Sequence, residues 1–358
     1  MRAVVAIATP PFCERFSAEV SPPCERAPGW LEGALFIHQR VGCFGDDCMA
    51  PSSIVFQDGE CSEALRGRLP KVELIAVDLD GTLLNSHAGL DKATLSAIQH
   101  VTDAGLIVVP ATGRVLSVLP DELFGNSGIE YVVCCAGATV LRMGESRDSC
   151  RAMKDEGFPP EEAAELIDVL TSCHQGDILV DFACEGLMYS EPDMLSAFSS
   201  FDVPGVSADY VRRSRLLVDD LVAAALHAPA PIGRVNVFAR DEGLRRELMA
   251  ELAKRESFEL GNSLAHNIEI NPMGSTKWRG LTWLCDRLGI SSDRIMAVGD
   301  GSNDVDMLRR SWVGVAMKNA SRDALAAADA RTTWSNDELG AARLLTEMAS
   351  LHHPENRE

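Results

Sequence analysis

The chain of 358 residues lacks several features that mark particular classes of protein. No apolar run approaches the ~18 residues that would suggest a membrane span. Basic residues are few: 33 Lys and Arg against 53 Asp and Glu give a formal net charge of −20, which argues against a general nucleic-acid binder with its basic face. Repeats and low-complexity tracts are also missing. The pattern predicts a globular protein, long enough for two domains, with neither nucleic acid nor membrane as a partner.

The cysteines also lack the spacing that is typical of disulfide frameworks and metal sites. There are 11 cysteines, but none forms a Cys-x-x-Cys pair, and an odd total does not suit a complete disulfide framework. Cys134 and Cys135 lie in an apolar run, which is typical of buried thiols. We therefore predict a reducing compartment and a cytoplasmic protein.

Residues 1–70 carry prolines that interrupt any regular element, and their periodicity is sparse. We expect a poorly ordered extension, and we predict that a chain starting near Leu69 would fold and keep its activity. The alternatives are a structural brace on the domains and an organelle-targeting leader. The apolar run from Ala3 is too short for a convincing secretory core, and early glutamates are unusual in a transit peptide.

A motif near Val72 combines a strand with two carboxylates. The apolar run that ends at Val77 predicts a strand buried on both faces of a parallel sheet. Asp78 and Asp80 follow at its carboxyl end, where ligands bind in open α/β sheets, so we expect both carboxylates at the floor of a site. The alternative is a solvated turn rich in aspartate.

Three more motifs follow in the chain: Ala111-Thr112-Gly113-Arg114, Gly274-Ser275-Thr276-Lys277 and Gly299-Asp300-Gly301-Ser302-Asn303-Asp304. With Asp78-Leu79-Asp80-Gly81-Thr82, they resemble motifs I to IV of the haloacid dehalogenase-like (HAD) superfamily. In detail they resemble the Cof-type phosphatases of subfamily IIB. The resemblance covers roughly residues 71–350. It implies an α/β fold, with a Rossmann-like parallel-sheet HAD core and an inserted α/β cap domain.

The resemblance implies the catalytic roles of four residues. Asp78 is the nucleophile that forms an aspartyl-phosphate, and Asp80 protonates the leaving alkoxide and then activates water. Lys277 neutralises the phosphate and the nucleophile, and Thr112 donates its hydroxyl to a phosphate oxygen. A lysine that opposes the dipole at a helix start suggests a functional reason for its place, although such a lysine is usually just solvated.

The resemblance also implies a metal site and substrate contacts. Asp78, the backbone carbonyl of Asp80 and Asp300 would hold the metal, while Asp304 would hold metal-bound water or complete the sphere. Hard oxygen ligands favour Mg²⁺. The substrate-binding set is Thr112, Gly113, Arg114, Lys277 and Asn303. For Arg114 a surface salt bridge is the alternative, and for Asn303 and Asp304 it is helix capping.

Three positions depart from the family pattern. Ala136 replaces the asparagine that is usual after the third strand, so an amide expected near the leaving group is absent. Trp278 and Lys318 each stand where glycine is common. These departures put any inherited substrate preference in doubt.

Periodic patterns place the elements and divide the chain into segments. The expected helices cover 91–101, about 115–124, 160–173, 241–254 and 338–349, with two more starting at Ser275 and Asn303; the expected strands cover 106–111, 131–135, 177–183, 232–239, 294–298 and 312–316. The catalytic core is predicted as 71–154 plus 263–350, and the cap as 155–262. The chain is expected to return to the core with the strand at Asn267.

These motifs predict a Mg²⁺-dependent phosphatase that hydrolyses a small phosphorylated metabolite, with a sugar phosphate as the favoured class. A phosphomutase of the same superfamily would use the same aspartate, and a non-catalytic metabolite-binding protein could share the scaffold. We expect a monomer or a homodimer.

Overall fold

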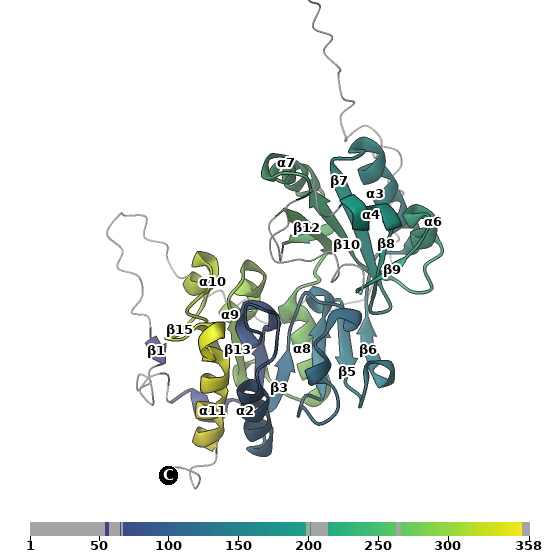
Figure 1. Cartoon of the computed structure of the whole chain (residues 1–358). Helices are drawn as coiled ribbons and strands as arrows, with labels where there is room; N and C mark the ends of the chain where they lie inside the picture. The colour runs from purple at the N-terminus through teal and green to yellow at the C-terminus, as the bar shows by residue number, and fades with distance from the viewer. Residues whose placement is uncertain are drawn as a thin grey trace, which may run out of the picture. The chain divides into compact units, whose positions relative to one another are not determined.

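The computed structural model describes residues 54–56, 65, 67–197, 201, 214–262 and 266–352. The core domain is built on a six-stranded sheet with the order β1-β15-β14-β13-β2-β3, and every pairing in it is parallel. Its strands are β1 (Ile54–Phe56), β2 (Leu74–Val77), β3 (Ile107–Pro110), β13 (Ile295–Gly299), β14 (Val313–Ala316) and β15 (Ala330–Thr332). Figure 1 labels most of them. The predicted Rossmann-like core is confirmed.

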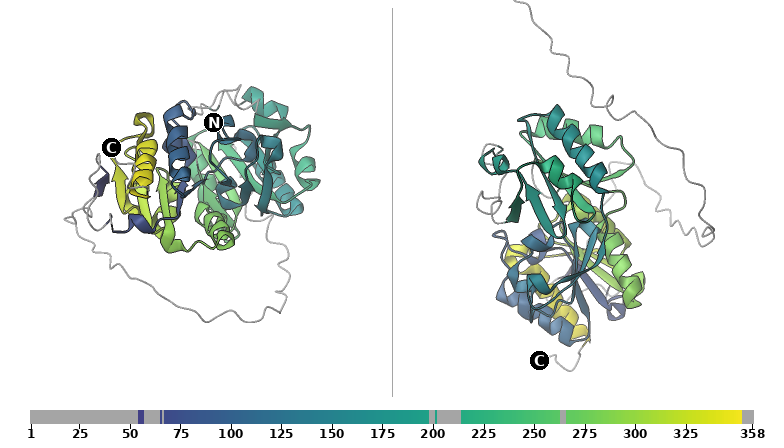
Figure 2. Two further views of the ribbon diagram at one scale, coloured as in Figure 1. Left: turned by 90° about the horizontal axis from the view of Figure 1, so that it is seen from below. Right: turned by 90° about the vertical axis from the view of Figure 1, so that its right-hand side faces the viewer.

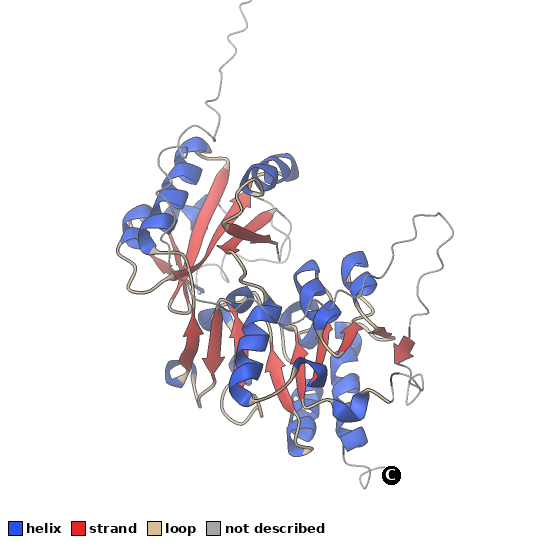
Figure 3. Ribbon diagram, turned by 180° about the vertical axis from the view of Figure 1, so that it is seen from behind, coloured by secondary structure: helices blue, strands red, loops and turns tan. Residues whose placement is uncertain are grey.

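Successive residues of β2 are buried on opposite faces of this sheet. Ile75 and Val77 belong to one apolar cluster, which includes residues of α2 (Lys92–Asp103) and α11 (Gly340–His352). Leu74 and Ala76 belong to another, which includes residues of α8 (Lys277–Leu288), α9 (Val305–Arg310) and α10 (Arg322–Ala327). Helices therefore cover the sheet on both sides, as Figure 3 shows. The views in Figure 2 also place α2 beside α11, and residues of the two helices are in contact.

The expected helix at about 115–124 is wrong. The structure has two short 3₁₀ helices there, Leu116–Val118 and Asp121–Leu123. Leu119 between them is extended, because the ring of Pro120 disfavours helical geometry in the residue before it. Beyond β3, the strands β4 (Tyr131–Cys134), β5 (Thr139–Arg142) and β6 (Arg151–Asp155) form an antiparallel sheet, joined to the core by a parallel bridge between Ala111 and Val133.

The cap has a second six-stranded sheet, with the order β11-β12-β10-β7-β8-β9. Its strands are β7 (Ile178–Cys184), β8 (Leu187–Ser190), β9 (Arg215–Leu217), β10 (Ile232–Ala239), β11 (Phe258–Gly261) and β12 (Asn267–Pro272). The helices of the cap are α3 (Pro160–Cys173), α4 (Pro192–Ala197), α6 (Leu221–Leu226) and α7 (Glu242–Leu252).

The prediction that the chain returns to the core at Asn267 is wrong. Strand β12 pairs antiparallel with β10 and β11 of the cap and has no partner in the core sheet among the described residues. Its sequence alternates polar and apolar residues, which suits a sheet with different surroundings on its two faces. The core strands β2 and β13 show no such alternation, because all of their residues are nonpolar and buried.

The predicted boundary at residue 70 is also wrong. Leu65 and Leu69 are fully buried in the core cluster that contains Ile75. Residues 54–56 extend the core sheet as β1, which pairs with β15. Residues 67–70 are described as well, and the remaining residues of the expected N-terminal extension lie outside the described part of the chain.

Two chemical features concern the described residues as a whole. The six cysteines in this part of the chain, Cys134, Cys135, Cys150, Cys173, Cys184 and Cys285, are free thiols. A search of the same residues for a helix that is long and apolar enough to span a bilayer finds none.

Candidate active site

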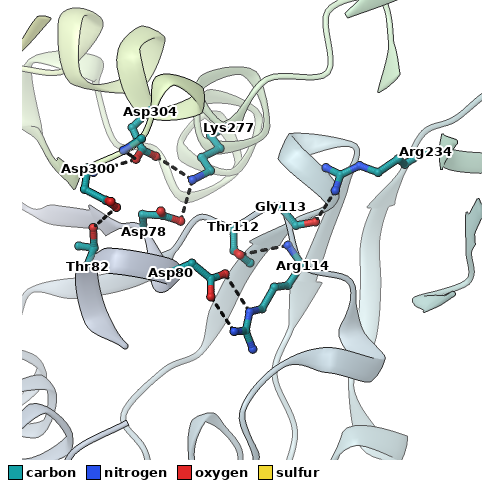
Figure 4. A network of polar contacts seen from close by, with 11 residues as sticks. Asp78, Asp80, Thr82, Thr112, Gly113, Arg114, Arg234, Lys277, Asp300 and Asp304 are labelled. Carbon is teal, nitrogen blue, oxygen red and sulfur yellow. Dashed lines mark hydrogen bonds and ion pairs between the residues drawn. The ribbon is translucent and has the colours of Figure 1, made fainter. Parts of the chain in front are cut away.

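The predicted catalytic residues meet at the carboxyl edge of the core sheet. Asp78 directly follows β2, Thr112 lies two residues beyond β3, and Asp300 directly follows β13. Because β2 lies between β3 and β13 in the sheet, the ends of these parallel strands converge. Figure 4 shows their side chains around the end of β2.

Lys277 links two of the carboxylates. Its Nζ lies 2.7 Å from Asp78 Oδ1 and 2.7 Å from Asp304 Oδ1. Lys277 is 1% exposed, Asp78 5% and Asp304 0%, so all three charges are withdrawn from water. Thr276 caps the helix that begins at Lys277, because its hydroxyl accepts a hydrogen bond from the Arg279 N–H. Two adjacent carboxylates thus offset the unfavourable position of the ammonium at a helix N-terminus.

Burial and like charges shift the acid–base properties of this cluster. Burial and the neighbouring Asp304 raise the pKa of Asp78 well above its usual value, although Lys277 opposes the change. Burial and Asp304 likewise raise the pKa of Asp300, to about 6. Burial alone would lower the pKa of Lys277, but Asp304 and Asp78 outweigh it and raise that pKa, so the ammonium stays charged.

The cluster fits a divalent cation. Asp78, Asp300 and Asp304 each offer a carboxylate oxygen, and these oxygens lie within 4.8 Å of one another. Carboxylates are the hard ligands that Mg²⁺ prefers, and one ammonium does not balance three of them. Burial is the largest cause of the raised pKa values of Asp78 and Asp300, and the repulsion by Asp304 that adds to it is what a bound cation would relieve.

Asp304 also shapes the loop after β13. Its Oδ2 accepts hydrogen bonds from the backbone N–H groups of Asp300 (2.9 Å) and Gly301 (2.8 Å). Its two oxygens therefore hold both Lys277 and the loop that carries Asp300. Asn303 is half-buried, and its side chain lies beside Gly301 in this loop.

The turn after β2 packs directly on Asp300. Gly81 has a φ of +74°, and a Cβ there would collide with the carboxylate of Asp300. The Thr82 hydroxyl donates to Asp300 Oδ1 at 3.0 Å. Asn319, just beyond β14, donates to the Gly81 carbonyl at 2.8 Å. The turn therefore fixes the orientation of the Asp300 carboxylate.

Asp80 takes a different direction from Asp78. Its two oxygens accept hydrogen bonds from Arg114 Nε at 2.9 Å and Nη2 at 2.6 Å, in a bidentate ion pair. The Asp80 side chain is 56% exposed, and Figure 4 shows it pointing toward Arg114 rather than Lys277. The predicted salt bridge of Arg114 is thus present, with Asp80 as its partner. Thr112 is fully buried, and its hydroxyl accepts from the Arg114 N–H at 3.1 Å.

A residue of the cap reaches the loop between Thr112 and Arg114. Arg234 on β10 donates from Nη1 to the Gly113 carbonyl at 2.9 Å. The same guanidinium lies 3.0 Å from Glu269 on β12 and donates from Nε to Asn271 Oδ1 at 2.9 Å. Arg234 and Glu269 are both more than 90% buried.

The three departures from the family pattern have separate structural settings. Ala136 follows β4 with a φ of +49°, a left-handed conformation that asparagine and glycine adopt more easily than alanine. Trp278 is buried in the apolar cluster that contains Leu74 and Ala76. Lys318 pairs with Glu338 at 2.8 Å on the surface. None of the three contacts the aspartate cluster.

Sequence reasoning missed three residues of this site. Thr82 belongs to the motif Asp78-Leu79-Asp80-Gly81-Thr82, but the sequence analysis gave it no role. Asn319 follows a parallel strand, and its place at the carboxyl edge of the sheet could have indicated that it belongs to the site. Arg234 had no signal, because it lies 121 residues from its partner Gly113 and in no motif.

The comparisons with known proteins identify the family of the chain. Residues 75–345 match the family described as haloacid dehalogenase-like hydrolase. The chain therefore belongs to the haloacid dehalogenase-like hydrolase family, and the resemblance to its Cof-type members is confirmed. The expected enzyme class, a phosphatase, agrees with the names of several Bacillus subtilis relatives.

Two relatives and one solved structure show the range of this likeness. The 5-amino-6-(5-phospho-D-ribitylamino)uracil phosphatase YwtE of Bacillus subtilis is 28% identical over 78% of this chain and 99% of its own length. The chloroplastic endoribonuclease YBEY of Arabidopsis thaliana is 29% identical over 80% of this chain but 48% of its own length, so the chain spans about half of that protein. A haloacid dehalogenase-like hydrolase structure from B. subtilis has a TM-score of 0.64 at 26% identity, over 76% of this chain and 99% of the other.

Proposed function

We propose that this protein is a Mg²⁺-dependent phosphatase that hydrolyses a small phosphorylated metabolite through an aspartyl-phosphate on Asp78. The observation that carries the proposal is the position of Lys277, a buried ammonium 2.7 Å from the carboxylates of Asp78 and Asp304. Phosphoryl transfer requires an in-line nucleophile and cations around the transferring oxygens. A carboxylate at the end of β2 with a fixed ammonium beside it meets both needs.

In this reaction four residues of the site act on the ester or on water. The Asp78 carboxylate attacks phosphorus and the ester oxygen leaves, taking its proton from Asp80. Thr112 donates its hydroxyl to a phosphate oxygen, and Lys277 offsets the negative charge of the phosphate. Asp80 then removes a proton from water, which attacks phosphorus and releases inorganic phosphate and free Asp78.

The metal would be held by Asp78, Asp300 and the backbone carbonyl of Asp80. Asp304 accepts hydrogen bonds from Lys277 and from two backbone N–H groups, which suits support of the site or a late place in the metal sphere. When bound, Mg²⁺ would neutralise charge on the transferring phosphate. Thr82 and Asn319 would keep the Asp300 carboxylate in place for it.

A sugar phosphate remains the substrate class that we favour. The name of the B. subtilis relative describes a phosphate ester of a ribityl chain, which is polyhydroxylated. The cap would close over such a substrate and exclude water from the aspartyl-phosphate. A phosphomutase would return the phosphoryl group instead of releasing it, and stoichiometric release of inorganic phosphate separates the two reactions.

Asp78→Asn tests the nucleophile. The amide keeps the shape of the carboxylate but cannot attack, so phosphate release from a panel of phosphorylated metabolites should fall by several orders of magnitude. An unchanged near-ultraviolet circular dichroism spectrum would show that the fold survives. Phosphate release near the wild-type rate would rule out the aspartyl-phosphate mechanism.

Chelation tests the metal. EDTA should abolish phosphate release and Mg²⁺ should restore it, whereas Ca²⁺ should restore little because its looser coordination misplaces the nucleophile. Full activity after rigorous chelation would contradict the proposed metal site.

The compartment and the assembly state remain predictions. Free thiols among the described cysteines suit the reducing cytoplasm that we predict. The chloroplastic relative lends some support to the organelle alternative. A monomer or a homodimer is the assembly that we expect.

A further inference from the structure

The cap sheet has one polar face, which we define by Asp181, Arg234, Asn236, Glu269 and Asn271. Asp181, Asn236 and Glu269 lie side by side on the neighbouring strands β7, β10 and β12. Each of the five residues is at most 6% exposed. The residues between them along these strands are apolar and point to the other face.

Within this face, Arg234 has one donor group that is not used. Its Nε and Nη1 have partners in Asn271, Glu269 and the Gly113 carbonyl. Its Nη2 is buried and has no hydrogen-bond partner among the described residues. Because buried donors are almost always satisfied, an unpaired Nη2 on a side chain that is 7% exposed points to a missing acceptor.

The position of Nη2 connects the cap with the proposed phosphate site. Both Nη1 and Nη2 lie 3.6 Å from the place where a Cβ of Gly113 would stand, so the guanidinium covers this glycine. Gly113 is flanked by Thr112 and Arg114, which are the proposed phosphate donor and the partner of Asp80. Figure 4 shows Arg234 reaching this loop from the cap side. In the proposed reaction the phosphate contacts Thr112, so the leaving group starts beside the loop that Arg234 covers.

Charges on the polar face restrict what the missing acceptor can be. The positive charge of Arg234 is already compensated by Glu269 at 3.0 Å, and the charge of Arg215 is compensated by Asp181 at 2.9 Å. A second anionic group on the ligand would therefore meet Glu269, and both arginines of the described part of this face are already paired. A hydroxyl or carbonyl oxygen can accept from Nη2 without adding charge.

We propose that Arg234 is a specificity-determining residue, whose Nη2 donates to a neutral oxygen on the leaving group of the substrate. The substrate is then a phosphate monoester with a hydroxylated or carbonyl-bearing leaving group, rather than a bisphosphate, a phosphorylated acid or an ester of an apolar alcohol. This inference rests on the proposed phosphatase function and adds the residue that selects the leaving group.

Arg234→Lys tests the inference, because lysine keeps the charge beside Glu269 and removes Nη2. The substrates are the best hydroxylated monophosphate from a panel of aldose and alditol phosphates, and phenyl phosphate, whose leaving group is apolar. We expect kcat/KM for the hydroxylated ester to fall roughly tenfold or more, and its loss to exceed the loss for phenyl phosphate by about that factor. Arg215→Lys is the matched control, since it alters another buried pair on the cap and should affect both substrates equally.

Two results would overturn the inference. An equal loss on both substrates in Arg234→Lys would show that Arg234 only positions the Gly113 loop. A wild-type preference for phenyl phosphate or for bisphosphates would show that the leaving group is not a neutral hydroxylated one.

A binding measurement separates this inference from the proposed function. In the Asp78→Asn background, Arg234→Lys should weaken calorimetric binding of the hydroxylated phosphate more than binding of inorganic phosphate. If the wild-type chain releases no phosphate from any ester but this difference persists, the phosphatase proposal fails and the role of Arg234 stands. If the difference is absent, the role of Arg234 fails whatever the catalytic result.

Discussion

Asp80 shows how a single ion pair can hold a side chain apart from the carboxylates around it. Its bidentate contact with Arg114 fixes the carboxylate at the loop after β3. Such paired hydrogen bonds are geometrically specific, although the 56% exposure of Asp80 limits their contribution to stability. For the proton transfer that we propose, Asp80 must face the ester oxygen, so Arg114 influences when the acid is available.

Asp80→Asn should slow phosphate release in a manner that depends on the leaving group. For an alkyl ester, loss of general acid catalysis typically lowers kcat by ~10²–10⁴-fold. With p-nitrophenyl phosphate, whose leaving group needs no proton, part of that loss should be recovered in the burst phase of aspartyl-phosphate formation. Arg114→Gln is the comparison, because it removes the ion pair but keeps the acid, and should preserve the leaving-group dependence of the wild type. Equal losses on both esters in Asp80→Asn would contradict the assigned role.

Asp300 gives the metal-free protein a specific pH dependence. The folded pKa is raised from 3.8 to about 6, so the folded state binds a proton more tightly than the unfolded state does. The stabilisation that Asp300 gives to the folded state is therefore complete below about pH 4, and it is lost as the pH rises through 6. The loss should be on the order of 2 kcal/mol in the free energy of unfolding. Denaturant titrations in EDTA at pH 4.5 and 7 should show it, and Asp300→Asn should remove this part of the pH dependence.

At the scale of elements, one close helix contact places the ammonium of the site. Gly280 in α8 faces Gly137, and a Cβ at 280 would lie 2.7 Å from both the Gly137 Cα and the Val133 side chain. Two glycines thus allow α8, which begins at Lys277, to approach the chain after β4. The location of Lys277 beside Asp78 depends on this approach.

Gly280→Ala has two opposite effects on stability, because alanine favours the helix but its Cβ would crowd this contact. Propensity alone would make alanine more stable by about 1 kcal/mol, but overpacking at such a contact costs roughly 1–3 kcal/mol. We therefore expect a lower melting temperature and a lower kcat, because α8 and Lys277 must move. Gly243→Ala in α7 is the reference, because a Cβ there would meet one side-chain oxygen, Oδ1 of Asp241 at 3.0 Å, instead of packed backbone. A Gly280→Ala protein as stable and active as the wild type would show that α8 shifts without moving Lys277.

The same elements show what the sequence could predict. Strands such as β2 and β13 were predictable because burial on both faces leaves an uninterrupted apolar run, and the amphipathic pattern of α2 was equally clear. The segment near Pro120 was mispredicted because apolar spacing was weighed above the restriction on Leu119. Strand β12 was assigned to the wrong sheet because a strand pattern does not name its partner.

The candidate site divides in the same way. The aspartates and Lys277 lie in motifs close to strand ends, so their convergence follows from a parallel sheet. Arg234 contributes through contacts between β10 and a loop far away in the sequence, which no local pattern encodes. Site residues that the core supplies were therefore predictable, whereas the contribution of the cap required the structure.

At the scale of the whole molecule, the site depends on segments from both sides of the cap insertion. Strands β2 and β3 precede the cap, and β13, β14 and β15 follow it, yet all share one sheet. Lys277 and Asp78 are 199 residues apart in the sequence. A change that weakens the packing of this sheet should therefore also affect the strands that carry the site residues.

The segment before Val72 is such a support. Leu69 is fully buried against the core, and the backbone carbonyl of Arg68 accepts a hydrogen bond from Trp312 Nε1 at 3.0 Å. The Arg68 guanidinium also pairs with Asp329 at 3.2 Å. These contacts oppose the prediction that a chain starting near Leu69 would fold and keep its activity, since such a start removes Arg68 and the buried Leu65.

Leu69→Ala in the full chain measures this support. Truncating a buried leucine typically costs about 2–5 kcal/mol, so the melting temperature should fall by roughly 5–15 °C. The exposed neighbour Pro70 is the control, and Pro70→Ala should cost less than about 1 kcal/mol. Below its melting temperature Leu69→Ala should keep kcat/KM within a few-fold, because Leu69 precedes β2 whereas the aspartates follow the carboxyl ends of the strands. If both variants melt like the wild type, the segment before Val72 is dispensable after all, and the buried position of Leu69 contributes nothing to the stability of the core.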